Sequence, residues 1–268
     1  MSMINMKKQD EMRAKLLLRA NSIDVLAAMK EDPTNPDLWY RLGVAYGEEK
    51  GFEESIDAFS QGLVHNPFNS DLYFGRGRKY IGAGKFWRAI SDFTMTIRLD
   101  PELWNHWYYR AVSYNLNGCP EDAIADFSQC LALTEPKDWY PMADWIFLTY
   151  VVDMGQMDQA KKSLESFDLS IVPPQMDYAY RRRVKLYKGV ITPEEFIDEA
   201  DITANMIEQP DRLALEIKTL IFGLFVYYTY VGETEKANEQ LIKIVNTKPS
   251  AAFGYIKAAQ IARKRGLV

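Results

Sequence analysis

The chain of 268 residues is 47% hydrophobic and 26% charged, a balance typical of folded globular proteins. Its formal net charge of −5 at pH 7 argues against a general nucleic-acid binder, which needs a basic surface to displace counterions. Residues 1–20 mix both charges without an apolar core of signal-peptide length, and the longest apolar stretch, 220–231, is too short to span a bilayer. We therefore expect a cytoplasmic protein that binds neither nucleic acid nor a membrane.

Residues 1–35 are predicted to form a degenerate N-terminal helical unit. This segment closes with Asp32 and Pro33, and a later segment closes in the same way with Asp100 and Pro101. Because proline disfavours helix in the residue before it, each pair is typical of a helix end.

Residues 36–135 contain a repeat with a period of 34 residues. Large apolar residues recur one period apart at Trp39, Tyr73 and Trp107; Tyr46, Tyr80 and Tyr114; Ile56, Ile90 and Ile124; and Phe59, Phe93 and Phe127. A small residue recurs in the same way at Gly43, Gly77 and Ala111. A fixed period of this size indicates a solenoid, in which each unit buries its apolar face against its neighbours.

Each clear copy is predicted to hold two helices, as the second copy illustrates. Ser70 and Asp71 offer N-cap oxygens for the first helix, which Gly82 and Gly84 end. The second helix is predicted over residues 85–99, where apolar side chains recur on one face.

The motif of the first copy resembles the tetratricopeptide repeat, which reads W-x2-L-G-x2-Y, then A-x3-F, then P. The matching residues here are Trp39, Leu42, Gly43, Tyr46, Ser55, Phe59 and Pro67. The resemblance implies an all-α, right-handed superhelical solenoid of tetratricopeptide-like helix pairs with a C-terminal capping helix. In this interpretation residues 36–135 form three clear repeats.

Residues 136–268 are predicted to continue the same solenoid as degenerate helical repeats and a capping helix. A fourth unit fits from about residue 141, with Gly155, Ala160 and Leu164 at the expected offsets. A helix pair follows over 175–203, its second helix opening at Thr192 and Pro193. A last unit fits from about residue 218, and 251–265 are the predicted capping helix.

Comparison of the three copies predicts two internal ion pairs. Leu42 is replaced by arginine in the next two copies, and the residue sixteen positions downstream changes from Ala58 to aspartate in both. A half-buried guanidinium needs a carboxylate partner. The pairs predicted on this basis are Arg76 with Asp92 and Arg110 with Asp126.

The sequence offers little catalytic chemistry. His65 and His106 are the only histidines and fall in different units, and no nucleophile elbow or phosphate-binding glycine loop is present. Cys119 and Cys130 lack metal-ligand spacing and are expected to be free thiols. We therefore predict no catalytic residues, no metal and no cofactor, and a protein that is not an enzyme.

A peptide-binding groove is the function that the resemblance implies, because the first helices of successive tetratricopeptide repeats line a concave surface. One equivalent column of that groove would hold Tyr40, Phe74 and Tyr108, continued by Trp145 and Phe222 in the weaker units. Neighbouring groove positions hold Arg41, Val44, Arg78, Tyr109, Val112 and Asn115. Such a column suits an extended peptide or a partner helix of an unidentified protein. The predicted role is an adaptor, scaffold or assembly factor.

Several alternatives stay open at this point. The same aromatics can instead pack against the adjacent unit, since aromatics dominate cores as well as interfaces. A co-chaperone is the next interaction role. The positions where chaperone-tail binders carry Lys and Asn read Tyr40 and Val44 in the first copy and Asn105 and Tyr109 in the third, which departs from that pattern. An enzyme or small-ligand regulator with a pocket between repeats is the alternative from another class.

The remaining features concern charge and self-association. Arg181, Arg182 and Arg183 form a basic cluster that either binds an anionic ligand or matches the acidic helix opening at Glu194 and Glu195. The packing interpretation is preferred because opposite charges lie on consecutive predicted helices. An apolar groove also permits a homo-oligomer.

Overall fold

A computed structural model describes residues 21–172, 174, 177–197, 210–247, 250 and 252–268. The chain divides into two compact units, Met1–Leu133 and Thr134–Val268. Helices and turns make up both units, and the described ranges contain no strand. The all-α class predicted from the sequence is therefore confirmed, whereas the division at residues 35 and 135 stays a prediction.

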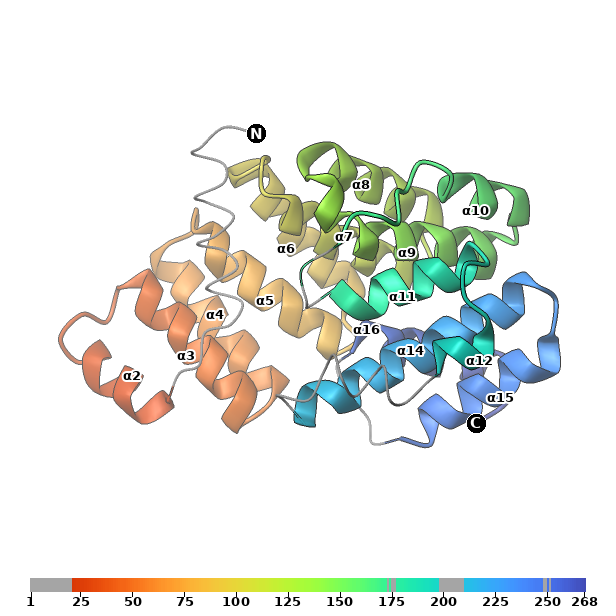
Figure 1. The fold of residues 1–268 in the computed structure, drawn as a ribbon. Coiled ribbons are helices and arrows are strands. Elements are labelled where there is room, and N and C mark those ends of the chain that lie inside the picture. Colours follow the sequence, from red (N-terminus) through yellow and green to blue (C-terminus); the bar gives the residue numbers. More distant parts are fainter. Residues whose placement is uncertain (1–20, 173, 175–176, 198–209, 248–249, 251) are drawn as a thin grey trace. The chain divides into compact units, whose positions relative to one another are not determined.

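The first unit is a series of helices that pack in consecutive pairs (Figure 1). They are α2 (Ser22–Met29), α3 (Pro36–Glu49), α4 (Phe52–His65), α5 (Ser70–Gly82), α6 (Phe86–Leu99), α7 (Trp104–Leu116) and α8 (Pro120–Leu133). The pairs α3–α4, α5–α6 and α7–α8 correspond to the three sequence copies. The two helices predicted for the second copy are confirmed, although part of the predicted leading unit, residues 1–20, lies outside the described ranges.

The helix ends are set by asparagine and glycine. The Asn69 side chain accepts a hydrogen bond from the backbone N–H of Leu72, at 3.0 Å, so Asn69 rather than Ser70 or Asp71 caps α5. Beyond the other end, Gly84 takes a φ of +71°, and the backbone N–H of Lys85 bonds to the Tyr80 carbonyl. A left-handed residue at this place suits glycine, which carries no Cβ.

Close helix contact in the first unit depends on the small residues of the repeat. A Cβ added to Gly43 would lie 2.6 Å from the Phe59 ring, and one added to Gly75 would lie 2.5 Å from it. Phe59, a residue of α4, is fully buried next to Gly43 of α3 and Gly75 of α5. The glycines therefore allow one aromatic ring to join α3, α4 and α5.

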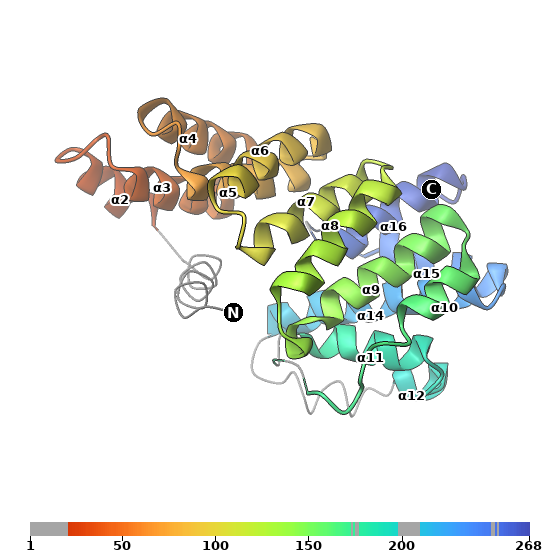
Figure 2. The same ribbon diagram turned by 90° about the horizontal axis from the view of Figure 1, so that it is seen from above.

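The helices of the second unit differ in length and type more than those of the first (Figure 2). They are η1 (Pro136–Asp138), α9 (Tyr140–Leu148), the π-helical η2 (Thr149–Met154), α10 (Met157–Ser163), α11 (Tyr178–Tyr187), α12 (Pro193–Phe196), α14 (Pro210–Tyr230), α15 (Thr234–Val245) and α16 (Phe253–Lys264). Helix α9 packs on α10 and α11, α11 packs on α14, and α14 packs on α15 and α16.

Several helix ends of the second unit lie where the sequence predicted them, whereas its division into repeats stays a prediction. Gly155 ends the first helix of the fourth unit with a φ of +67°, and Thr192 and Glu195 form a capping box at α12. Helix α16 stands where the capping helix was predicted. Helix α14 begins at Pro210, ahead of the predicted start of the last unit near residue 218. Residues 175–176 and 198–203 of the predicted helix pair lie outside the described ranges.

Both ion pairs predicted from the repeat are present. Arg76 donates through Nε and Nη2 to the two carboxylate oxygens of Asp92, both at 2.8 Å. Arg110 binds Asp126 in the same bidentate way, at 2.7 and 2.9 Å. The third guanidinium nitrogen of Arg76 reaches Ser60 Oγ on α4, at 3.1 Å, so the pair also links adjacent repeats.

We expect Asp92→Ala to lower the free energy of unfolding by about 2 kcal/mol, because it leaves a half-buried guanidinium without its carboxylate. The first copy supplies the control, since Leu42 and Ala58 occupy the equivalent positions. The double variant R76L/D92A, measured by urea unfolding, should return to within about 1 kcal/mol of the wild type. A double variant as unstable as the single one would contradict this explanation.

Candidate functional site

The predicted aromatic column lies inside the protein. Tyr40, Phe74 and Tyr108 expose 4%, 0% and 8% of their surface, and Trp145 and Phe222 are buried as well. The expectation that these side chains form an open column of anchors is therefore corrected. They are packing residues. The side chains that a partner can reach are their neighbours on the same helices.

Aromatic packing between successive pairs is the physical reason for this burial. The Phe74 ring lies 5.8 Å from Phe93 of its own pair and 5.1 Å from Tyr109 of the next pair. Tyr108 packs edge-to-face on Phe127 of α8, at 5.9 Å. Such contacts hold the layers of a repeat array together.

Four of the predicted residues reach the surface of the first helices. Arg41 is exposed, and Val44, Arg78 and Tyr109 are half-buried. They lie on α3, α5 and α7, where α5 packs against both of the other helices. We call these four residues the first-helix surface. Of the other two predicted groove neighbours, Asn115 and Val112 are buried.

Arg78 and Arg41 are the two cations of this surface, and Arg78 lies against an aromatic ring. Its guanidinium lies 5.6 Å from the centre of the Tyr109 ring, a cation–π distance. Neither Arg78 nor Arg41 has an ion pair or hydrogen bond with any residue that the structure describes. Burial raises the pKa of the neighbouring Tyr40 to about 12, so its phenol stays neutral and does not balance the arginines. Both guanidinium groups are therefore available to an anionic partner.

His106 is buried in the first unit and does not face solvent as a catalyst would. Its Nδ1 lies 3.2 Å from the Asp100 carbonyl oxygen, and its ring packs 5.4 Å from Phe74. Burial lowers the pKa of His106 from 6.5 to about 4, because the charged form loses its hydration. The imidazole is thus neutral at pH 7.

The pKa of His106 predicts acid sensitivity. Since the folded pKa lies below the unfolded value, stability is complete above pH 6.5 and is lost as the pH falls toward 4. We expect His106 to contribute a loss of about 2 kcal/mol between pH 7 and pH 5. Urea unfolding of the wild type and H106Q at both pH values measures this contribution as the difference between their pH dependences. Equal pH dependences would contradict it.

The basic cluster is turned inward, and each arginine has a separate internal partner. Arg181 bonds to the Leu169 carbonyl at 2.8 Å, and Arg182 bonds to the carbonyls of Glu195 and Phe196 at the end of α12. Arg183 forms an ion pair with Asp144 of α9. The cluster packs internally, but the match with the acidic helix that the sequence favoured is not what the described residues show: the partners of the three arginines are backbone carbonyls and the buried Asp144.

A buried ion pair in the second unit escaped the sequence analysis. Arg183 Nε lies 2.9 Å from Asp144 Oδ1, and the two side chains are 3% and 0% exposed. Arg183 Nε also donates to the Tyr187 hydroxyl, at 3.0 Å. Burial raises the pKa of Asp144 to about 6, while the nearby guanidinium acts to lower it. No periodic copy of this pair exists elsewhere in the sequence that would have revealed it.

Three further observations concern metal ligands, membrane-spanning helices and thiols among the described residues. They contain no cluster of His, Cys, Asp and Glu arranged to hold a metal ion. None of their helices combines the length and the apolar character needed to cross a bilayer. Cys119 and Cys130 are free thiols, as predicted.

Comparison with known proteins supports the fold. No family model matches the sequence, and no curated protein matches it significantly. A tetratricopeptide repeat protein from Parabacteroides merdae is similar in structure, with a TM-score of 0.56 and 17% identity over 89% of this chain and 91% of that one. The MamA protein is similar with a TM-score of 0.50 and 18% identity, over 71% and 97%. The chain therefore has the tetratricopeptide-type helical repeat fold.

Proposed function

We propose that this protein is a non-catalytic interaction module, an adaptor, scaffold or assembly factor, that binds a peptide or partner helix across the first-helix surface. The observation that carries the proposal is that Arg41 and Arg78, on adjacent first helices, have no carboxylate partner among the residues that the structure describes. The half-buried guanidinium of Arg78 is costly to leave unpaired, so the surface favours a partner that supplies acidic groups.

The geometry of the surface favours an elongated partner. Arg41 and Val44 on α3, Arg78 on α5 and Tyr109 on α7 follow one another across three packed helices. A partner that crosses them meets an apolar side chain, two cations and an aromatic ring in turn. Charge-assisted hydrogen bonds fix its register, and the half-buried Tyr109 offers an aromatic contact at one end of the row.

The alternative is a regulator that binds a small ligand, and one observation favours it. The second unit contains a cavity of about 370 Å³. An interaction module and a ligand site are compatible on one chain, because the two candidate sites lie in different units.

Charge reversal at matched positions tests the interaction proposal. The partner is first identified by affinity capture from the native cell extract, and its affinity for purified variants is then measured. We expect R78E to weaken binding by about tenfold or more, because a guanidinium–carboxylate contact becomes a repulsion. Arg98 is exposed on α6, the second helix of the same pair, so R98E is the control and should bind as the wild type does. Equal affinities of R78E and R98E would refute the assignment of this surface.

A further inference from the structure

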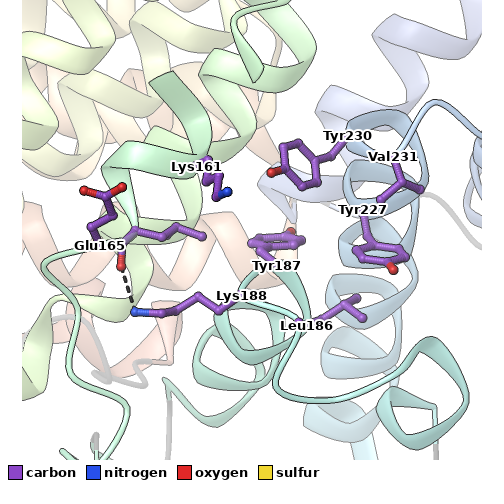
Figure 3. A pocket seen from close by; sticks show the side chains of 10 residues that line it. Lys161, Glu165, Leu186, Tyr187, Lys188, Tyr227, Tyr230 and Val231 are labelled. Carbon is purple, nitrogen blue, oxygen red and sulfur yellow. Dashed lines mark hydrogen bonds between the residues drawn. The ribbon is translucent and has the colours of Figure 1, made fainter. Parts of the chain in front are cut away.

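The second unit has a cavity of about 370 Å³ at the C-terminal ends of three helices (Figure 3). Its lining comes from the end of α10 and the residues after it, from the end of α11, and from the end of α14. The volume falls within the range of about 300–1,000 Å³ that small-molecule sites occupy.

The interior of the cavity is apolar and partly aromatic. Leu164 and Leu186 are buried at its wall, and the Tyr187 ring lies beside them. Tyr187 is held rigidly, because it stacks on Phe147 with the ring centres 4.3 Å apart. The Tyr227 ring lines the same space. These surfaces suit a planar apolar group, since aromatic rings pack well against one another.

The two lysines of the lining differ in what they already bind. Lys188 Nζ donates to the backbone carbonyls of Leu164 and Phe167, both at 2.8 Å, so its ammonium group is occupied by the fold. Lys161 Nζ has no hydrogen bond or ion pair with any residue of the described ranges. Lys161 is thus the cation that this cavity offers to a ligand.

A hydrogen-bond donor lines the same cavity as that cation. The Tyr230 hydroxyl also has no hydrogen-bond partner within the part of the chain that the structure describes. Figure 3 shows the polar ends of Lys161 and Tyr230 turned toward each other across the cavity, while the Glu165 carboxylate points away. An ammonium and a phenol together form a site for a carboxylate.

We infer that this cavity binds an aromatic carboxylate, a planar ring that carries a carboxylate on a short side chain. The ring lies between Leu186, Tyr187 and Tyr227, and the carboxylate receives hydrogen bonds from Lys161 and Tyr230. This chemistry has two sources, a free aromatic acid or the C-terminal aromatic residue of a peptide. The inference rests on the second unit alone and does not depend on the proposed interaction surface.

Calorimetric titration of the full chain tests this inference with two probes that differ in charge, 3-phenylpropionate and 3-phenylpropan-1-ol. We expect the acid to bind more tightly than the alcohol. The variant K161M keeps the aliphatic stem but removes the ammonium group, and should weaken binding of the acid by about tenfold without changing that of the alcohol. Lys162 is exposed on the same helix and does not line the cavity, so K162M should leave both affinities unchanged.

A further variant shows where the ligand binds, and two peptide probes show whether the ligand is a free acid or a peptide end. V231W places a large ring at the cavity mouth and should abolish binding of both probes. A short peptide ending in phenylalanine, with a free or an amidated C-terminus, tests the peptide source: tighter binding of the free form than of 3-phenylpropionate assigns the ligand to a peptide end. Failure of 3-phenylpropionate and of the free peptide to bind the wild type overturns the inference, as does equal weakening by K161M and K162M.

Discussion

Replacement of Asp144 by alanine is expected to lower the free energy of unfolding by about 3–5 kcal/mol. The carboxylate lies 2.9 Å from Arg183 Nε, and neither side chain reaches solvent. Without Asp144, the guanidinium stays buried among Tyr180, Tyr187 and Phe222 with no opposite charge beside it. Urea unfolding followed by circular dichroism at pH 7 measures the loss.

A second variant separates the ion pair from simple packing. D144A/R183M removes both charges and keeps an apolar side chain of similar length at position 183. Because a buried pair gains little over apolar residues of similar volume, the double variant should recover most of the stability that D144A loses. If the double variant is no more stable than D144A, the loss comes from the cavity left at Asp144 and not from the unpaired arginine.

The two buried titratable groups are both in their functional charge state at pH 7, where the D144A loss is measured. Burial raises the pKa of Asp144 to about 6 against the lowering effect of Arg183, so the carboxylate is still charged at pH 7 and balances the guanidinium. His106 contributes stability above pH 6.5 that is lost as the pH falls toward 4, so acid destabilises the first unit through this group.

The sequence predicted those parts of the structure in which equivalent positions of the repeat copies could be compared with one another. The Arg76–Asp92 pair was predictable because the equivalent Leu42 and Ala58 changed together. The Arg183–Asp144 pair joins α9 to α11 in the irregular unit, where no second copy offers such a comparison. Its partners are distant in sequence and were brought together only by packing.

The prediction that Tyr40, Phe74 and Tyr108 form an open groove column was wrong for a related reason. A repeat motif tells which helix a residue belongs to, but burial depends on how closely the neighbouring pair approaches. At Phe74 the next pair places His106 and Tyr109 against the ring, which closes it off from solvent. Side-chain size alone therefore misidentified anchors, whereas the lack of a carboxylate partner for Arg78 within the described part of the chain was recognisable only once its surroundings were known.

Phe74→Ala is expected to destabilise the protein by about 3–5 kcal/mol, because truncation of a fully buried aromatic ring loses its transfer free energy and leaves a cavity. The ring contacts Phe93 of its own pair and His106 and Tyr109 of the next, so its loss weakens both a repeat and the junction to its neighbour. In a repeat array such a junction carries the cooperativity between units. Urea unfolding should therefore show a lower midpoint together with a broader transition.

Trp87 on α6 provides the matched control, because its side chain is large, aromatic and 62% exposed. W87A should change the free energy of unfolding by no more than about 0.5 kcal/mol. Comparison with R78E then separates structure from binding: F74A should lose stability and R78E should lose partner affinity while remaining folded. A stable F74A that had nevertheless lost its partner would return Phe74 to the binding surface, since only a side chain that reaches the ligand acts on affinity without acting on the fold.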